Sequence, residues 1–186
     1  MISFTEIFDM VMMTAFVGFI FSDIFKRFQA REVLDYLKPG FDWDSFKFAA
    51  LVTAPGLILH ELAHKFVAMG FGMQATFHAA YVWLVIGLLL KLLNFGFIIF
   101  VPAFVSILGS GTNLQFAVIA FAGPAMNLLL WLGTDFAFKK GMIKPKQQRV
   151  AFLTREINKF LFIFNMIPLP MFDGFKVFSN LIKVIF

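Results

Sequence analysis

Long apolar tracts limit what this chain can fold into. Residues 10–25, 46–70, 81–107 and 114–134 are each dominated by aliphatic and aromatic side chains. A helix needs about 20 apolar residues to cross a bilayer, and these tracts approach or exceed that length. The chain is 60% hydrophobic and 15% charged, whereas soluble domains have roughly 45–50% apolar and about 25% charged residues. We therefore predict an all-α integral membrane protein, and the composition excludes both a soluble domain and an intrinsically disordered chain.

The spacing of the tracts predicts a multi-pass helical bundle with about five to six membrane segments. The tract at 81–107 is interrupted by Lys91 and Asn94. We expect a helix over 81–94 and then a re-entrant extended (β-type) segment over 96–107, since non-helical backbone lies at membrane depth only where protein or water covers it. The other helices are expected at 10–25, 46–70, 114–134 and 148–165.

The chain divides into two parts after residue 45. Residues 1–45 are predicted to form a first membrane helix and a polar, basic loop, and residues 46–186 contain every other predicted segment. Asp44 or Ser45 is expected to cap the helix that begins near residue 46, because such side chains accept hydrogen bonds from the free amides of a first turn. The tail at 173–186 is too short to cross a bilayer alone.

Positive charges gather in two loops. The stretches 26–47 and 139–149 each carry five Lys or Arg residues, while 70–80 and 108–114 carry none. Loops rich in Lys and Arg stay in the cytoplasm, so we expect both basic loops there, in a multi-pass protein of the cell membrane. The net charge of +5 then reflects these loops, and the lipid bilayer rather than nucleic acid is the expected partner.

The second predicted helix contains the motif His60-Glu61-Leu62-Ala63-His64. Residues four apart lie on one face of a helix, about 6 Å apart along the axis, so two imidazoles with this spacing can bind one metal ion. A Glu directly after the first His can reach a metal-bound water as a general base. The motif would arise by chance in about one shuffled sequence per thousand, and ionisable residues inside a membrane mark functional sites by default.

A zinc site of this kind needs a third protein ligand. The chain has no Cys, which excludes thiolate ligands. His78 is the remaining His, but Tyr81 and Trp83 follow it, a pattern typical of a membrane interface. Asp173 is the better candidate, because a carboxylate between prolines and a glycine in an apolar stretch does not serve solubility. The alternative for Asp173 is the N-cap of a helix formed by the tail.

Three motifs occur in a fixed order along residues 46–180. They are HELAH at 60–64, GPAMN at 123–127, and Asn165-x-x-Pro168 followed by Asp173-Gly174. In kind, order and spacing they resemble the motifs of the site-2 protease family of intramembrane zinc metalloproteases, and most closely its short forms without a PDZ domain. Phe172 stands where that family commonly has Leu.

The resemblance implies a role for each motif residue. His60, His64 and Asp173 are expected to bind one Zn²⁺ ion per chain, with Glu61 as the general base. The amide of Asn165 is expected to hold the carbonyl of the substrate. Asn127 is expected to support the site.

The resemblance also implies a substrate class: the transmembrane helix of another membrane protein. Residues 46–186 would then form the catalytic membrane core. The alternating directions of the helices at 46–70, 114–134 and 148–165 bring the three motifs to one depth, opposite the basic loops. Because a helix must unwind before its peptide bonds can be cleaved, the extended run at 95–105 would offer an edge for the opened segment. The alternative for this run is a packed hairpin with no role in substrate binding.

Two other functions fit part of the pattern. A metal transporter could use His60, His64 and Asp173 as a transit site, but transporters typically show internal repeats and the chain has none. A catalytically idle scaffold would have no use for Glu61. No residue pattern indicates an oligomeric state.

The charge count predicts the orientation of the chain. Because the chain has no native Cys, a single Cys introduced at Lys144 can be labelled selectively. We expect this Cys to react with a membrane-impermeant maleimide only from the cytoplasmic face. Labelling from the outer face would contradict the assignment of the basic loops to the cytoplasm.

Overall fold

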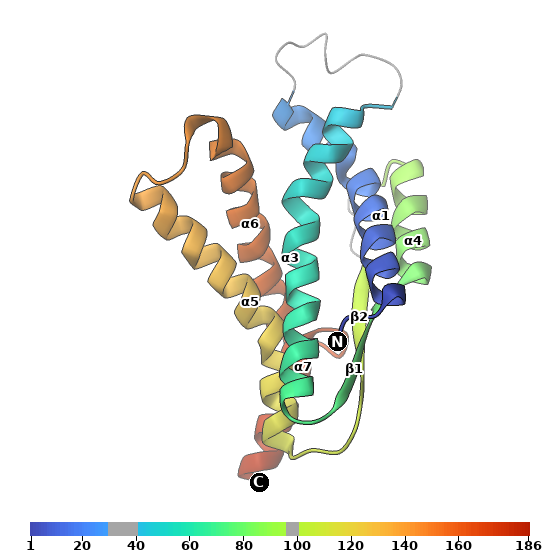
Figure 1. Ribbon diagram of the computed structural model, residues 1–186, viewed down its shortest axis with the longest axis vertical. Coiled ribbons are helices and arrows are strands. Elements are labelled where there is room, and N and C mark those ends of the chain that lie inside the picture. Colours follow the sequence, from blue (N-terminus) through green and yellow to red (C-terminus); the bar gives the residue numbers. More distant parts are fainter. Residues whose placement is uncertain (30–40, 96–100) are drawn as a thin grey trace. The chain divides into compact units, whose positions relative to one another are not determined.

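The structure is a computed structural model that describes residues 1–29, 41–95 and 101–186. The helices are α1 (Phe4–Gln29), α3 (Trp43–Gly70), α4 (Tyr81–Leu92), α5 (Asn113–Lys139), the 3₁₀ turn η1 (Pro145–Gln147), α6 (Gln148–Asn165) and α7 (Asp173–Ile185), and the strands are β1 (Gln74–Ala79) and β2 (Ala103–Leu108) (Figure 1). Each predicted helix is present, and the tail forms α7.

The predicted fold class, a helical membrane bundle with a short extended segment, is confirmed. Among the described residues, three helices are long and apolar enough to cross a membrane: Phe4–Lys26, Trp43–Gly70 and Asn113–Lys139. α4 is apolar but shorter, and α6 contains four charged side chains in its 18 residues. The figure of five to six membrane segments therefore stays a prediction.

Two compact units make up the chain. One comprises Met1–Pro55 and Ala79–Phe104, and the other comprises Gly56–His78 and Val105–Phe186. All the residues of the three sequence motifs belong to the second unit.

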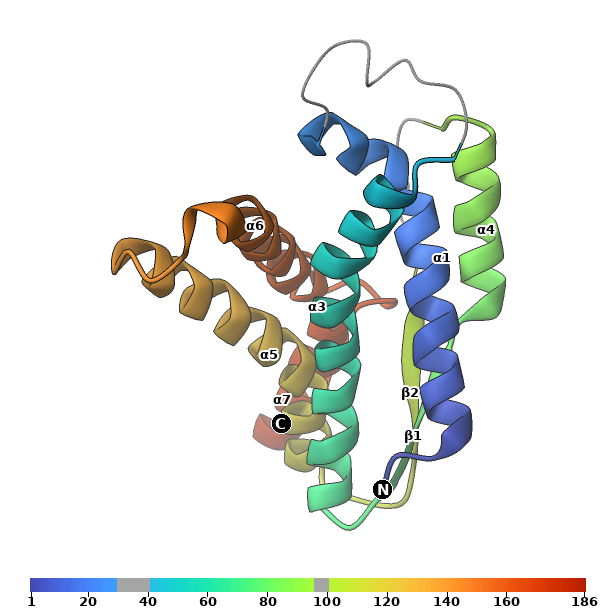
Figure 2. The same ribbon diagram turned by 45° about the horizontal axis from the view of Figure 1, so that its top comes forward.

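In the first unit, α1 lies beside α4 in both views (Figures 1 and 2). The Lys91 ammonium of α4 donates hydrogen bonds to the Phe19 carbonyl and, at 2.7 Å, to the Ser22 hydroxyl of α1. It also lies 3.5 Å from the Asp23 carboxylate and 3.8 Å from the centre of the Phe19 ring. The charge that interrupts this apolar tract is therefore matched by acceptors on the neighbouring helix, as the high cost of an unpaired buried charge requires.

The N-cap of α3 differs from the prediction. Asp42, and not Asp44 or Ser45, accepts hydrogen bonds from the amides of Asp44 and Ser45 at 3.0 and 3.1 Å. The Ser45 hydroxyl also donates to Asp42, at 2.8 Å. These hydrogen bonds to the charged form hold the pKa of the Asp42 carboxyl below its usual value. The error arose because three of the four residues 42–45, namely Asp42, Asp44 and Ser45, are all good caps.

The extended segment pairs with a strand that was not predicted. β1 and β2 form a two-stranded sheet. The Ala80 amide donates to the Pro102 carbonyl at 3.0 Å, and the Ser106 hydroxyl donates to the Thr76 carbonyl at 3.4 Å. Residue numbers fall along one strand as they rise along the other, so the strands are antiparallel. Of the predicted segment 96–107, residues 96–100 lie outside the described residues.

In the second unit, α5 packs against both α6 and α7 (Figures 1 and 2). Its start is fixed by a capping box, in which the Thr112 hydroxyl accepts from the Gln115 amide and the Gln115 side chain accepts from the Thr112 amide. The short connection through η1 returns the chain as α6, and α7 begins directly at Asp173. The second unit therefore brings the part of α3 that carries both motif His residues together with α5, α6 and α7.

Candidate metal centre

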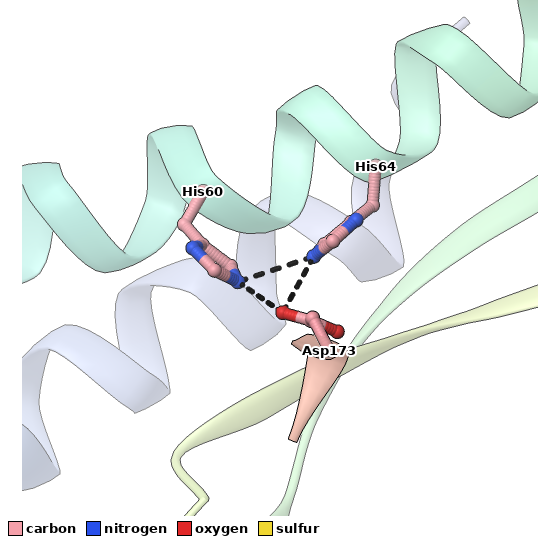
Figure 3. Close-up of side chains that lie close together, drawn as sticks. All are labelled: His60, His64 and Asp173. Carbon is pink, nitrogen blue, oxygen red and sulfur yellow. Dashed lines mark hydrogen bonds and ion pairs between the residues drawn. The ribbon is translucent and has the colours of Figure 1, made fainter. Parts of the chain in front are cut away.

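His60 and His64 project from one face of α3 toward Asp173, the first residue of α7 (Figure 3). Both imidazoles are buried, with 5% and 7% of their surface exposed. Their Nε2 atoms lie 3.1 Å apart, and the Asp173 Oδ2 atom lies 3.0 Å from Nε2 of His60 and 3.2 Å from Nε2 of His64. Three potential ligand atoms therefore meet at one point, although Asp173 follows His64 by 109 residues.

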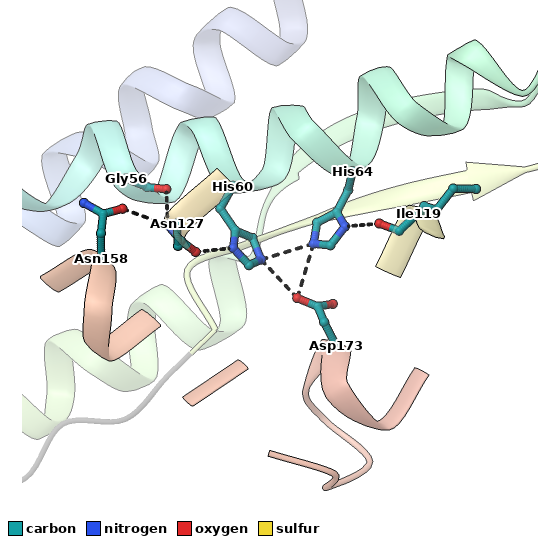
Figure 4. Close-up of polar contacts among 7 residues, drawn as sticks. All are labelled: Gly56, His60, His64, Ile119, Asn127, Asn158 and Asp173. Atoms are coloured by element: carbon teal, nitrogen blue, oxygen red, sulfur yellow. Dashed lines mark hydrogen bonds and ion pairs between the residues drawn. The ribbon is translucent and has the colours of Figure 1, made fainter. Parts of the chain in front are cut away.

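The other nitrogen of each imidazole is held by an acceptor (Figure 4). The His64 Nδ1 atom lies 2.7 Å from the Ile119 carbonyl oxygen, which can only accept. The His60 Nδ1 atom lies 2.5 Å from Asn127 Oδ1, and the amide nitrogen of Asn127 is already used, since it donates to the Gly56 carbonyl at 3.2 Å. Both rings therefore carry their proton on Nδ1 and direct the Nε2 lone pair toward Asp173.

This donor set fits a metal ion. Two Nε2 lone pairs and a carboxylate oxygen facing one another repel unless a cation lies between them. A tetrahedral zinc ion with ligands about 2.0–2.1 Å away places those ligands about 3.3 Å apart, and the observed separations are 3.0–3.2 Å. Within the described parts of the chain, these three residues are the group that could hold a metal ion. Three protein ligands leave a fourth position for water, as in catalytic zinc sites.

Gly123 on α5 leaves the room that this centre needs. A Cβ atom at residue 123 would lie 2.3 Å from Nε2 of His64 and 2.5 Å from Nε2 of His60. Any side chain there would occupy the place between the ligand atoms. Pro124 follows and lacks the amide that would donate to the preceding turn, so α5 is weakened close to the Ile119 carbonyl that holds His64.

The position of Asp173 is fixed from both sides. Phe172 is buried, and its ring packs edge-on against Phe164 of α6 at 4.5 Å between ring centres. A Cβ atom at Gly174 would lie 2.4 Å from the Met166 carbonyl oxygen, so only glycine lets the first turn of α7 approach the end of α6 this closely.

The remaining predicted residues occupy different positions. Asn127 is fully buried and contacts His60 directly. Glu61 lies close enough to both His residues and Asp173 for charge–charge interaction. Asn165 is the last residue of α6, and among the described contacts no hydrogen bond joins its amide to the three ligand candidates. His78 lies on β1 with its Nε2 atom 2.9 Å from the Ser106 hydroxyl, so the structure favours Asp173 as the third member.

The sequence interpretation missed Asn158, which is fully buried on α6 and accepts a hydrogen bond from Asn127 at 2.9 Å. The sequence gives little local signal for it, because Arg155, Glu156 and Lys159 lie beside Asn158 and a polar residue among charged ones is usual on a helix surface.

The chain was compared with known proteins. No family model matches it, and no solved structure matches it. A Methanocaldococcus jannaschii protein named "putative zinc metalloprotease" is 33% identical over 166 residues, which cover 81% of this chain and 85% of that protein. The chain belongs to this zinc metalloprotease family. A Synechocystis protein with the same description is 26% identical over 146 residues, 78% of this chain and 34% of its own length, so the chain spans about a third of that relative.

The sequence motifs predicted a zinc metalloprotease that acts within the membrane. Membership of this family confirms the broader part of that prediction, namely that the chain is a zinc metalloprotease. The cofactor is Zn²⁺, and the His60–His64–Asp173 group supplies ligand types that zinc prefers.

The close approach of Gly123 yields a test of the metal centre. We expect Gly123→Ala to reduce zinc affinity by at least 10-fold, because the added methyl group would displace both imidazoles. Gly133→Ala on the same helix is the matched control, since a Cβ there meets nothing within 4 Å. Zinc binding is measured by competition with a chromogenic chelator. Equal zinc affinity in the two variants would contradict the placement of Gly123 against the ligands.

Proposed function

We propose that the chain is an intramembrane zinc metalloprotease of the site-2 protease kind, which cleaves a transmembrane segment of a membrane-protein substrate. The observation that carries this proposal is the convergence of Asp173 on His60 and His64, two buried residues of α3, a helix long and apolar enough to cross a membrane. A hydrolytic site at such a depth would act on peptide bonds that soluble proteases do not reach. The motifs at 60–64, 123–127 and 165–174 support the narrower family assignment.

In this proposal His60, His64 and Asp173 hold the zinc ion. Zinc bound there supplies Lewis acidity, which polarises the peptide carbonyl and makes a coordinated water acidic near neutral pH. The Glu61 carboxylate accepts the proton of the attacking water as the carbon–oxygen bond forms. It then delivers that proton to the amine nitrogen as the carbon–nitrogen bond breaks.

Asn165 is proposed to donate a hydrogen bond from its amide to the carbonyl oxygen of the scissile bond. The position of Asn165 at the end of α6, eight residues before Asp173, supports a place at the same site. A side-chain donor to a developing oxyanion contributes about 3 kcal/mol to the transition state. Asn127 has a different role, because its contact with His60 orients a ligand and leaves no amide hydrogen for the substrate.

A substrate helix must open before its carbonyl can reach the zinc. We propose that the opened segment adds as a strand to the β1–β2 sheet, since the sheet has two strands among the described residues and each then presents an outer edge for pairing. The edge first expected at 95–105 falls partly outside the described residues, and β2 itself begins at Ala103. Main-chain pairing of this kind recognises an extended backbone and needs no fixed substrate sequence.

The proposed location is the cell membrane, where the helices Phe4–Lys26, Trp43–Gly70 and Asn113–Lys139 would each cross the bilayer. The alternative of a metal transporter has less support. The described residues contain one group able to hold a metal ion, whereas a transit path needs sites at several depths, and the relatives are named as metalloproteases.

The proposal is tested with Glu61→Gln. We expect the purified variant to hold zinc as the wild type does and to lose proteolysis by about 10²–10⁴-fold, because the base is gone while the ligands remain. Zinc content is measured by atomic emission, and cleavage is measured in liposomes with single-span peptides that carry Gly and Pro at their centre. Equal cleavage by both proteins would remove Glu61 from the mechanism, and zinc-dependent cleavage of soluble peptides alone would contradict an intramembrane substrate.

The variants Asp173→Ala and Asn165→Ala should lose activity for different reasons. Asp173→Ala should lose zinc affinity together with activity, since a carboxylate is a zinc ligand and offsets part of the charge of the ion. Asn165→Ala should keep its zinc and lose turnover by about 10²–10³-fold, with little change in KM. The two measurements are zinc content and steady-state cleavage of the same peptides. Full zinc content in Asp173→Ala would show that Asp173 is not a ligand.

A further inference from the structure

Asn158 is a fully buried amide in the middle of α6, outside the three sequence motifs. Its Nδ2 atom donates to the Thr154 carbonyl, one turn earlier on the same helix, at 2.8 Å. Its Oδ1 atom accepts from Asn127 Nδ2 of α5 at 2.9 Å. Because the Thr154 carbonyl can only accept, the orientation of the Asn158 amide is fixed with Oδ1 facing Asn127 (Figure 4).

That orientation determines how the Asn127 amide lies. The nitrogen of Asn127 faces two acceptors, the Gly56 carbonyl of α3 at 3.2 Å and Asn158 Oδ1. Its oxygen is consequently left to face Nδ1 of His60, at 2.5 Å. In the flipped orientation the Asn127 oxygen would face two other acceptors, and its nitrogen would face the N–H of His60. Asn158, together with the Gly56 carbonyl, therefore selects one of the two amide orientations of Asn127.

The packing around Asn158 leaves this amide little freedom. A Cβ atom at Gly56 would lie 2.9 Å from Asn158 Oδ1 and 3.2 Å from its Nδ2. α3 and α6 therefore approach closely because residue 56 is glycine, and the Asn158 amide lies against the α3 backbone one turn before His60. Removing a buried amide from such a position leaves the Asn127 N–H without one of its two acceptors, which is costly in a site closed to water.

We propose that Asn158 is a positioning residue of the zinc centre: through the Asn127 amide it fixes the Nδ1–H tautomer of His60 and so directs the Nε2 lone pair of His60 toward the metal. The inference rests on the proposed function only in taking His60 as a zinc ligand. Residues that orient a ligating His typically change metal affinity by about 10–100-fold when removed. Asn158 acts one hydrogen bond further away, so the expected effect is about 10-fold.

The experiment uses the full chain in detergent micelles, with zinc as the only added ligand. Asn158→Leu keeps the branched shape of the side chain and removes its acceptor, and Asn158→Ala removes the acceptor with a smaller residue in case the first variant does not fold. We expect either change to weaken zinc binding about 10-fold. In the zinc-free protein, ¹⁵N NMR of the three His residues should show His60 as a single Nδ1–H tautomer in the wild type and as a mixture in the variant.

Two comparisons separate this role from simple packing. Leu153→Ala removes a buried side chain from the same helix and should leave zinc affinity and the His60 tautomer unchanged. In an Asn127→Leu background the Asn158 substitution should cost nothing further, because residues acting through one another are not additive. Wild-type zinc affinity in the Asn158 variants, an equal loss in Leu153→Ala, or a full further loss in the Asn127→Leu background would each overturn the proposal.

These readouts are independent of proteolysis. A wild-type chain that binds zinc and cleaves no transmembrane peptide would overturn the proposed function and leave the role of Asn158 standing. Conversely, an Asn158 variant with unchanged zinc affinity and an unchanged His60 tautomer would overturn this inference while Glu61-dependent cleavage remained.

Discussion

The convergence of three electron-pair donors on one point is the interaction on which the rest of the second unit depends. Two imidazole nitrogens and a carboxylate oxygen lie 3.0–3.2 Å apart, and their mutual repulsion is relieved only by a cation. The surrounding residues follow from that requirement. Ile119 and Asn127 hold the outer nitrogens, Gly123 leaves the centre open, and Gly174 lets the carboxylate approach.

Polar groups within apolar helices impose a second constraint, because each one left unpaired costs several kcal/mol in a medium without water. Among the described residues, no buried side-chain nitrogen or oxygen lacks a hydrogen-bond partner. The amides of Asn127 and Asn158 illustrate how this is achieved, since each uses its oxygen and its nitrogen and together they join α3, α5 and α6. The hydrogen bonds that satisfy these amides are also those that orient His60.

The sequence predicted those features of the structure that depend on local periodicity along the chain. The i, i+4 spacing placed His60 and His64 on one face, and the apolar tracts located the long helices. Asp173 was proposed as the third ligand because a carboxylate between prolines and a glycine in an apolar stretch does not serve solubility. The strand β1 was missed because the pairing of a short, mixed segment depends on a distant partner and has little local signal. Asn158 was missed for a related reason. Its role depends on contacts with α3 and α5, which are distant in the sequence and cannot be inferred from its neighbours on the same helix.

The three ligand candidates are supported in unequal ways. His60 and His64 share one regular helix, so their separation is set by helix geometry and by the two outer hydrogen bonds. Asp173 instead follows a turn that contains Pro168 and Pro170, and its place depends on the Phe172–Phe164 contact and the close packing of Gly174. Helix α3 thus provides a rigid half-site, and the α6–α7 connection completes it. Helix α6 therefore reaches the centre at two places, through Asn158 on His60 and through Phe164 on Asp173.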